Sequence, residues 1–437
     1  MDIKVVKFGG SSLCDAEHFR RVAEIIKSDP TRRYVVASAP GKRFAEDSKV
    51  TDLLYRCYAT AVDEGDITDI FNEIKGRYDS IIEELKLDID LTEAYEKIKT
   101  SLLHSTGRDY IASRGEYLNS MILAKYIGYS FIDAKKVIFF NEDGSFNAEK
   151  TNTVMREYLS NYERAVIPGF YGSMPNGTVK TFTRGGSDIT GSIIARAVSA
   201  KLYENWTDVS GVLMADPRII DNPKVIDVIT YKELRELSYM GATVLHDEAI
   251  FPVRSSKIPI NIKNTMRPEE KGTLILPSTD IPNNSIVTGI AGKTGFSTIT
   301  IEKDIMHSEL GFARRILQVI EENGIPFEHF PSGIDTMTLV ISTEMLEEKR
   351  AEVLAGICRR VNPDNIFVED NLALIAVVGR GMIRAKGTAA RVFTSLAKAE
   401  INVRMIDQGS SELNIIIGVD SNDYVEALNA IYKEFVD

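Results

Sequence analysis

Hydrophobic and polar residues follow two different periods along the first 265 positions. Short runs rich in valine and isoleucine alternate with longer segments in which apolar residues recur every three or four positions. The short runs predict strands at residues 3–8, 34–38, 165–168, 180–183, 202–207 and 258–263. The longer segments predict helices that include residues 16–27, 52–63, 67–85, 109–127, 189–200 and 231–239. This alternation favours an α/β fold, an αβα sandwich around a mostly parallel central sheet.

Two stretches interrupt the alternation. Residues 65–105 are charged and helical without a strand pattern, and they predict a helical excursion from the sheet. Residues 267–284 are rich in proline, glycine and asparagine, and they predict a boundary or connector. We therefore expect a first domain at residues 1–284 and a second region at residues 285–437.

The second region contains an internal repeat. The segment from Gly311 matches the segment from Gly387 at a constant offset of 76 (387 − 311), and apolar residues such as Ile316 and Val392 coincide. Each copy reads as strand, loop, helix, strand, turn and strand. One such unit cannot bury both its sheet and its helix faces well, so the repeat favours pairing within the chain or across a dimer.

Composition narrows the class of protein. At 437 residues, the chain is too long for one ordinary core and predicts two or three domains. A net charge of −11 argues against a general nucleic-acid or anionic-membrane surface. We expect no membrane span and no signal peptide, because the necessary apolar runs are missing. Three cysteines without metal-type spacing indicate a reduced, cytoplasmic protein.

The stretch KFGGSS at residues 7–12 is the first candidate for chemistry. It follows a predicted strand, and Gly9 and Gly10 would let backbone N–H groups approach an anion closely. A helix just beyond adds its positive end, and Lys7 offers a point charge to phosphate. The lysine precedes the glycines, unlike the lysine of a Walker A loop. Taken alone, the stretch fits a tight turn with a surface lysine equally well.

The stretch TRGGSD at residues 183–188 repeats this arrangement before another predicted helix. Arg184 offers a planar fork to a carboxylate or phosphate, and Ser187 could cap the helix. Asp188 would lie in the first helical turn, where the helix dipole favours a carboxylate even without a function.

Two further stretches combine glycine with charge. In WTDVSGVLMADPRI, Thr207 and Asp208 end a strand, where nucleotides usually bind in α/β sheets, although ordinary loop chemistry would explain them as well. In SRGEYLNS, Gly115 costs about 1 kcal/mol relative to alanine inside a helix. That cost indicates close approach of another group beside Glu116, either a ligand or a second helix.

Other motifs are set aside. Gly379-Arg380-Gly381 begins like a dinucleotide fingerprint, but Arg384 occupies the position of the third glycine, so we interpret it as a turn. The five histidines are scattered without metal or triad spacing, so no metal-ligating residues are predicted.

The motifs and their order resemble the aspartate kinases of the amino-acid kinase family. KFGGSS, RGGSD, WTDVSG with ADPR, VLHDEAIFP at residues 244–252 and the tandem repeat span nearly the whole chain. The resemblance implies an amino-acid kinase fold followed by two ferredoxin-like ACT domains. The first is expected at residues 296–368, and the second at residues 369–437 with a strand from residues 285–291.

The resemblance also implies an activity and residue roles. An aspartate kinase uses ATP and Mg²⁺ to phosphorylate the side-chain carboxylate of L-aspartate, the first step towards lysine, threonine and methionine. The implied catalytic residues are Lys7 and Asp188. The implied substrate residues are Ser38, Thr51, Glu116, Arg184, Gly185 and Ser187. The implied nucleotide residues are Lys7, Gly9, Gly10, Ser11, Thr207, Asp208, Leu213 and Arg218.

Three positions depart from the family pattern. Leu213 stands where many relatives have a tyrosine near the adenine, so it offers only an apolar contact. Met266 stands where some relatives have a nucleotide-binding lysine. Asp247 replaces a proline of many relatives and is expected to alter only a helix start.

The implied reaction agrees with the lack of an activated histidine or serine among the motifs. The acceptor carboxylate, with a reference pKa of roughly 3.9, is already ionised at neutral pH and needs no general base. Catalysis then requires alignment and positive charge between two anions.

The repeat is expected to bind an amino-acid inhibitor. Residues 306–312 lie at a loop-to-helix junction, where the helix dipole would favour the α-carboxylate of the inhibitor. The predicted effector-binding residues are Met306, Ser308, Gly311, Phe312, Glu328 and Asp335. Lysine, with two ammonium groups, is the first choice and threonine the second. In the family the ligand binds between ACT modules of two chains, which implies a homodimer or a dimer of dimers.

Three alternatives stay open. Another amino-acid kinase would use acetylglutamate, glutamate or UMP, and the tandem repeat argues against it. A non-catalytic amino-acid sensor would bind ligand only, and the joint presence of Lys7, Arg184, Asp188 and Asp208 argues against it. The repeat could also be a purely structural dimerisation module.

Overall fold

The computed structural model describes residues 2–104, 107–183, 185–242, 247–278 and 285–436, and of residues 247–249 it describes the backbone only. The contacts divide the chain into two compact units. The first comprises Met1–Val212, Val225–Lys232 and Thr243–Thr279. The second comprises Leu213–Lys224, Glu233–Ala242 and Asp280–Asp437.

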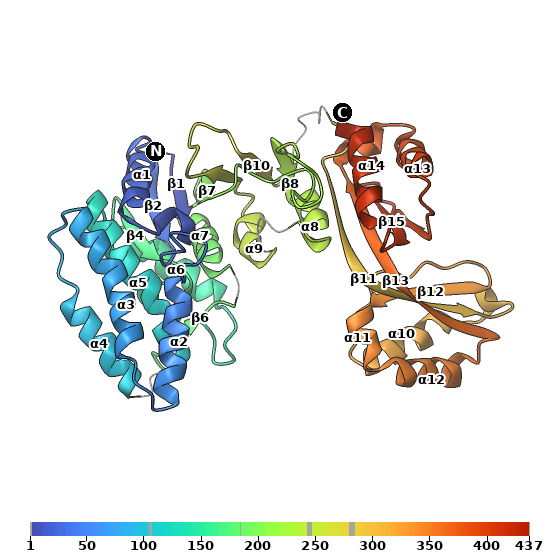
Figure 1. The fold of residues 1–437 in the computed structure, drawn as a ribbon, viewed down its shortest axis with the longest axis horizontal. Coiled ribbons are helices and arrows are strands. Elements are labelled where there is room, and N and C mark those ends of the chain that lie inside the picture. Colours follow the sequence, from blue (N-terminus) through green and yellow to red (C-terminus); the bar gives the residue numbers. More distant parts are fainter. Residues whose placement is uncertain (1, 105–106, 184, 243–246, 279–284, 437) are drawn as a thin grey trace. The chain divides into compact units, whose positions relative to one another are not determined.

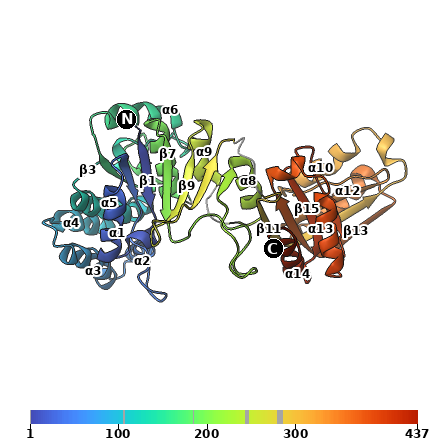
Figure 2. The same cartoon turned by 90° about the horizontal axis from the view of Figure 1, so that it is seen from above.

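An eight-stranded sheet in the order β3-β4-β2-β1-β7-β9-β10-β8 forms the centre of the first unit (Figure 1). Every neighbouring pair is parallel except β9 and β10, so the predicted mostly parallel sheet is confirmed. Figure 2 shows β1, β7 and β9 running side by side. The strands are β1 Lys4–Phe8, β2 Arg32–Ala37, β3 Ser130–Phe131, β4 Ala165–Pro168, β7 Leu202–Thr207, β8 Val228–Thr230, β9 Ile260–Asn264 and β10 Thr273–Leu276. A separate hairpin joins β5 (Tyr171–Ser173) to β6 (Val179–Thr181).

The helices up to residue 255 include all those predicted from the sequence. They are α1 Ala16–Lys27, α2 Val50–Val62, α3 Thr68–Glu84, α4 Thr92–Leu103, α5 Arg108–Ile127, α6 Ala148–Leu159, α7 Gly186–Ala197, α8 Tyr231–Tyr239 and α9 Asp247–Ser255. Helices α3 and α4 confirm the predicted helical excursion. None of the helices in the described parts of the chain is long and apolar enough to cross a membrane.

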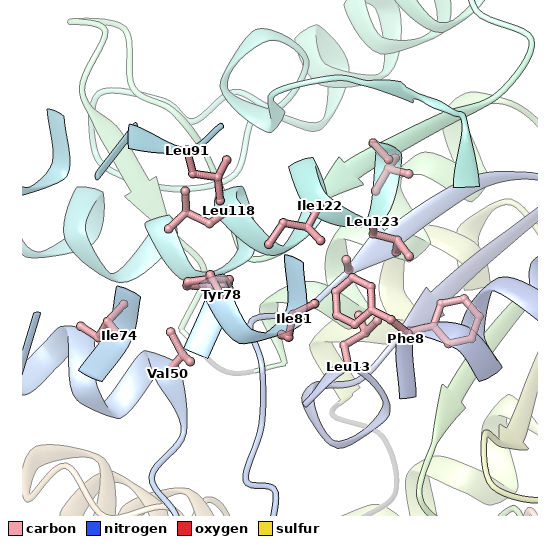
Figure 3. Packing of buried hydrophobic residues seen from close by; sticks show 14 of the residues in the cluster. Phe8, Leu13, Val50, Ile74, Tyr78, Ile81, Leu91, Leu118, Ile122 and Leu123 are labelled. Atoms are coloured by element: carbon pink, nitrogen blue, oxygen red, sulfur yellow. The ribbon is translucent and has the colours of Figure 1, made fainter. Parts of the chain in front are cut away.

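The excursion packs onto the end of the sheet that carries the first glycine turn. Phe8 of β1 and Leu13 share a hydrophobic cluster with Tyr78 of α3 and with Leu118 and Ile122 of α5 (Figure 3). Each of these side chains is almost wholly removed from solvent. Burial of a large apolar side chain contributes roughly 1.5–3 kcal/mol, so the cluster fixes the turn firmly against α3 and α5.

Part of the predicted connector at residues 267–284 is a strand instead. Residues Thr273–Leu276 form β10, in which Thr273 and Ile275 are fully buried. The Thr273 hydroxyl accepts from the Val212 N–H and donates to the Ile226 carbonyl. The alternation of buried and less buried positions covers only four residues, which is too short to predict a strand among the surrounding turn residues. The predicted boundary at residue 284 lies outside the described residues.

The second unit is built on a five-stranded antiparallel sheet in the order β12-β11-β13-β15-β14. Its strands are β11 Gly289–Glu302, β12 Thr336–Ser342, β13 Asn365–Val378, β14 Met405–Asp407 and β15 Asn414–Asp420. Its helices are α10 Phe312–Glu322, α11 Thr343–Glu347, α12 Arg350–Val361, α13 Thr388–Lys398 and α14 Tyr424–Val436. The two repeats correspond to α10 with β12 and to α13 with β15, as the offset predicts.

Strands β11 and β13 serve both repeats. The first part of β11 (289–293) pairs with the last part of β13 (374–378) beside β15. The second part of β11 (296–302) pairs with β12 and with the first part of β13. The segment after Val378 forms the turn predicted for Gly379-Arg380-Gly381, a 3-10 helix at Arg380–Arg384.

Candidate active site

The first glycine turn is shaped by close backbone contacts. After β1, the Gly9 N–H donates to the Trp206 carbonyl over 3.0 Å, and Gly10 begins a 3-10 turn. The Gly41 N–H donates to the Gly10 carbonyl over 2.8 Å. A Cβ atom on Gly10 would lie 2.8 Å from the Ala39 carbonyl oxygen, so no larger residue fits there.

Lys7 does not have the surface position that the tight-turn interpretation would give it. Its residue is 8% exposed, and its Nζ lies 2.6 Å from Asp188 Oδ1. Asn205 Nδ2 donates to the same carboxylate oxygen over 3.0 Å. Asn205 was not singled out from the sequence, although a polar side chain in the buried strand β7, directly beside Lys7, is the signal that could have found it.

The second glycine turn brings Asp188 to Lys7. Helix α7 begins at Gly186, three residues before the predicted start, and Gly185 occupies the N-cap with φ 60°. The prediction that Ser187 caps this helix is therefore wrong. Asp188 lies in the first helical turn, as predicted. Arg184 lies outside the described residues.

The loop between β2 and α2 carries two predicted substrate residues at its ends. Ser38 follows β2, and its N–H donates to the Phe8 carbonyl over 3.2 Å. Thr51 lies in the first turn of α2. Ser38 therefore lies directly beside the end of β1 that carries Lys7.

A buried arginine of α3 holds this loop. The Arg77 guanidinium donates to the carbonyls of Gly41 and Ser48 and lies 3.1 Å from Asp47. Arg43 and Arg77 hold the pKa of the Asp47 carboxyl well below its ordinary value. Arg77 was not predicted from the sequence, because no local pattern in an amphipathic helix indicates a contact with a distant loop.

Glu116 is a buried carboxyl group on α5. Burial raises its pKa to about 8, against the hydrogen bond that it accepts from the Ala39 N–H. Its Oε2 has no hydrogen-bond partner among the described residues. A carboxyl group with a raised pKa and an unpaired oxygen is suited to receive a cation.

Gly115 is explained by packing rather than by a ligand. A Cβ atom on Gly115 would lie 2.8 Å from Ala39 Cβ and 3.3 Å from Leu54 Cδ1. Its carbonyl accepts from the Tyr78 hydroxyl over 2.9 Å. Of the two interpretations, close approach of neighbouring elements accounts for this glycine.

The predicted nucleotide residues fall in both units. Thr207 ends β7 and Asp208 follows it, with the Thr207 hydroxyl 3.1 Å from Asp208 Oδ1. Leu213 and Arg218 belong to the second unit, where the exposed Arg218 side chain pairs with Asp216 over 2.6 Å. The structure therefore brings Lys7, Gly9, Gly10 and Asp188 together, and the nucleotide role of every one of the predicted residues stays a prediction. No contact of Ser11 bears on its predicted role.

Four of the predicted effector residues, Met306, Ser308, Gly311 and Phe312, lie at or just before the start of α10. Gly311 is its N-cap with φ 74°, and the side chains of Met306 and Phe312 are buried in the core of the second unit. The Ser308 hydroxyl donates to the Ile305 carbonyl, and Asp335 Oδ1 accepts from the Ile305 N–H. Glu328 accepts from the Tyr239 hydroxyl. Of these residues, Met306 and Phe312 could meet a ligand only through their backbone.

One group of side chains among the described residues has the spacing of metal ligands. Cys14, Asp15 and His18 bring their ligand atoms within 4.8 Å of one another. Asp15 is also the N-cap of α1 and accepts from the His18 N–H, so a local helix cap accounts for the arrangement.

Comparisons with known proteins identify the family of the chain. The model of the amino acid kinase family matches residues 2–264, and an ACT domain model matches residues 375–435. Aspartokinase 3 of Bacillus subtilis is 40% identical over 454 residues, which span 99% of this chain and 98% of the relative. The crystal structure of Clostridium acetobutylicum aspartate kinase has a TM-score of 0.91 at 53% identity and covers 99% of this chain and 100% of its own.

More distant structures include two of Escherichia coli aspartokinase III. One is described as a complex with aspartate and ADP in an R-state, and the other as a complex with lysine and aspartate in a T-state. Their TM-scores are 0.74 and 0.72, each at 25% identity and with full coverage of both chains. The family model over residues 2–264 and the match along nearly the full length to a 40% identical relative show that this chain belongs to the aspartokinases of the amino acid kinase family.

Proposed function

We propose that this chain transfers the γ-phosphoryl group of ATP to the β-carboxylate of L-aspartate and forms 4-phospho-L-aspartate. The observation that carries the proposal is the Lys7 ammonium, which lies 2.6 Å from Asp188 between two glycine turns. Membership of the aspartokinases and the aspartate and ADP bound to the Escherichia coli relative support the choice of substrates.

The charges around Lys7 suit transfer between two anions. The acceptor carboxylate needs no base, so catalysis depends on alignment and on positive charge near the moving phosphoryl group. Asp188 holds the Lys7 ammonium in place, and Asn205 fixes the same carboxylate oxygen. Backbone N–H groups of the turns at Gly10 and Gly185 would add further positive potential.

Recognition of aspartate would come from groups on both sides of the acceptor. Glu116 Oε2 is an unpaired acceptor suited to the substrate ammonium. Ser38 and Thr51 would flank the substrate, and Arg184 would clamp a carboxylate through its planar guanidinium. Together they distinguish an amino acid from a plain dicarboxylate.

Mg²⁺ would enter with the phosphates of ATP. The donor set at Cys14, Asp15 and His18 does not fit Mg²⁺, which prefers oxygen ligands. No group of three aspartate or glutamate carboxylates with the spacing of metal ligands comes together in the described parts of the chain.

Formation of aspartyl hydroxamate tests the activity. Protein, ATP, Mg²⁺, L-aspartate and hydroxylamine should give an ATP-dependent hydroxamate. Lys7→Ala should lower kcat by at least about 100-fold, because the charge between the two anions is lost. Lys201→Ala is the matched control, since Lys201 is an exposed lysine paired with Asp2. A kcat for Lys7→Ala close to that of the unmodified protein would refute the assignment.

A panel of acceptors separates the alternatives. Another amino-acid kinase would prefer acetylglutamate, glutamate or UMP over aspartate as the acceptor that drives ATP consumption. A non-catalytic sensor would consume no ATP with any of them.

We further propose that lysine, or else threonine, inhibits the chain by binding between ACT modules of a homodimer or a dimer of dimers. Support comes from the loop-to-helix junction at Gly311 and from the lysine bound to the Escherichia coli relative. Inhibitor titrations with lysine, threonine and both together test this proposal. An unchanged rate in all three titrations would leave the repeat as a structural module.

A further inference from the structure

The buried face of α5 carries polar atoms beyond those assigned to the site. Asn119 lies one helical turn after Glu116, and its side chain is fully buried. Its Nδ2 donates to the Ser38 carbonyl over 2.7 Å. Its Oδ1, like Glu116 Oε2, is buried and has no hydrogen-bond partner among the described residues.

Asn119 and Glu116 hold the same peptide group. The peptide that joins Ser38 to Ala39 offers its carbonyl to Asn119 and its N–H to the Glu116 carboxylate. The carbonyl and the N–H of a trans peptide point in opposite directions, so the group is fixed at both ends by one helix. Its position determines where Ser38 lies and how the Glu116 carboxylate is turned.

The chemistry of the amide indicates that its role goes beyond packing. The reverse orientation would place Asn119 Oδ1 against the Ser38 carbonyl, two acceptors face to face. In the observed orientation Oδ1 stays unpaired among the described residues, and a buried unpaired polar atom destabilises the folded state. Leucine, of similar size, would fill the same space without that cost. The amide of Asn119 is therefore explained by the hydrogen bond that its Nδ2 donates to the Ser38 carbonyl.

We propose that Asn119 is a positioning residue for the amino-acid substrate. By fixing the Ser38–Ala39 peptide, it holds the Glu116 carboxylate with Oε2 free to receive the substrate ammonium. The proposal rests on the proposed function and extends it to a residue that would act through Glu116 and Ser38. It concerns the amino acid rather than the nucleotide, because Asn119 Nδ2 donates its hydrogen bond to the carbonyl of Ser38, a predicted substrate residue.

Steady-state kinetics of two variants test the role. Asn119→Ala removes the amide, and Asn119→Leu replaces it at similar volume. Both should raise KM for aspartate by about tenfold or more and leave KM for ATP within about twofold. Ser120→Ala is the matched control, because Ser120 is the next residue, is equally buried and has a hydroxyl without a partner among the described residues. It should keep both KM values.

The unmodified protein is assayed first, so that two failures can be told apart. If it forms no aspartyl hydroxamate, the proposed function fails. If it is active, KM for aspartate that stays within about twofold in both variants overturns the role of Asn119, and so does an equal rise of both KM values. Loss of folding in both variants, with Ser120→Ala intact, overturns it as well, since Asn119 would then serve the fold.

Discussion

At the scale of single residues, the site treats its charged groups in two ways. Lys7 and Asp188 pair with each other over 2.6 Å. Glu116 is buried without a cation, which raises its pKa to about 8. The Lys7–Asp188 pair is in place for phosphate, whereas the Glu116 carboxyl group needs its ligand to become charged.

Aspartate binding should therefore depend on pH. Below about pH 8 the Glu116 carboxyl is protonated, and it must lose that proton to receive the substrate ammonium. As pH rises from 6 to 8, the Kd for aspartate should fall by up to about tenfold for each pH unit. Above pH 8 it should level off. Calorimetry in buffers of different ionisation enthalpy measures both Kd and the released proton. A Kd that is constant over this range would contradict the expectation.

The same carboxyl group affects stability in the opposite sense. The folded protein keeps the proton up to about pH 8, while the unfolded chain releases it near its ordinary value of 4.5. The free energy of unfolding should therefore fall as pH rises through this window. Urea titrations at several pH values measure the slope, and Glu116→Gln should make it shallower.

At the scale of elements, helix α3 connects the predicted excursion to the site. Arg77 holds the carbonyls of Gly41 and Ser48, and the neighbouring Tyr78 holds the carbonyl of Gly115. One helix thus fixes the loop that carries Ser38 and the helix that carries Glu116. The helical excursion therefore supports the site and is not merely an addition to the sheet.

Removal of Arg77 should destabilise the first unit. Arg77→Met would leave the buried Asp47 without its buried partner, and loss of one member of such a pair costs about 3–5 kcal/mol. Arg43→Met is the matched control, because Arg43 binds the same carboxylate but is 37% exposed. Its loss should cost less, about 1 kcal/mol. Chemical denaturation measures both values, and equal losses would disprove a special role for α3.

The elements were more predictable from the sequence than the contacts between them. Strand β7 and helix α1 begin and end where the periods of apolar residues place them. Strand β10 was missed, because four alternating residues carry too little signal beside turn residues. Asn119, Asn205 and Arg77 were also missed, since each acts on a residue distant in sequence, such as Arg77 on Gly41. Glycine turns can be read locally, but the buried donors that hold them cannot.

At the scale of the whole molecule, the two units are interleaved along the chain. The chain passes from one unit to the other five times, after residues 212, 224, 232, 242 and 279. Residues 213–224 belong to the second unit, where the Met214 carbonyl accepts from the Ile290 N–H over 2.7 Å. Glu233 is fully buried there and pairs with Arg380 over 2.8 Å. A cut near residue 284 therefore separates partners within one unit.

A fragment of residues 1–284 should be less stable than the sequence boundary suggests. Met214 would lose the N–H of Ile290, and the Glu233 carboxylate would lose the Arg380 guanidinium that pairs with it. Limited proteolysis should cleave the fragment within residues 213–242 at protease levels that leave the full chain intact. Equal resistance of fragment and full chain would contradict this expectation.

The two long strands of the second unit have a consequence for its folding. Strands β11 and β13 are 14 residues each, and each lies partly in one repeat and partly in the other. If one repeat unfolded alone, its halves of β11 and β13 would lose their hydrogen-bonded pairing. The sheet edge of the other repeat would then be exposed. We therefore expect both repeats to melt in one cooperative transition. The unit that was duplicated in the sequence is not the unit that folds.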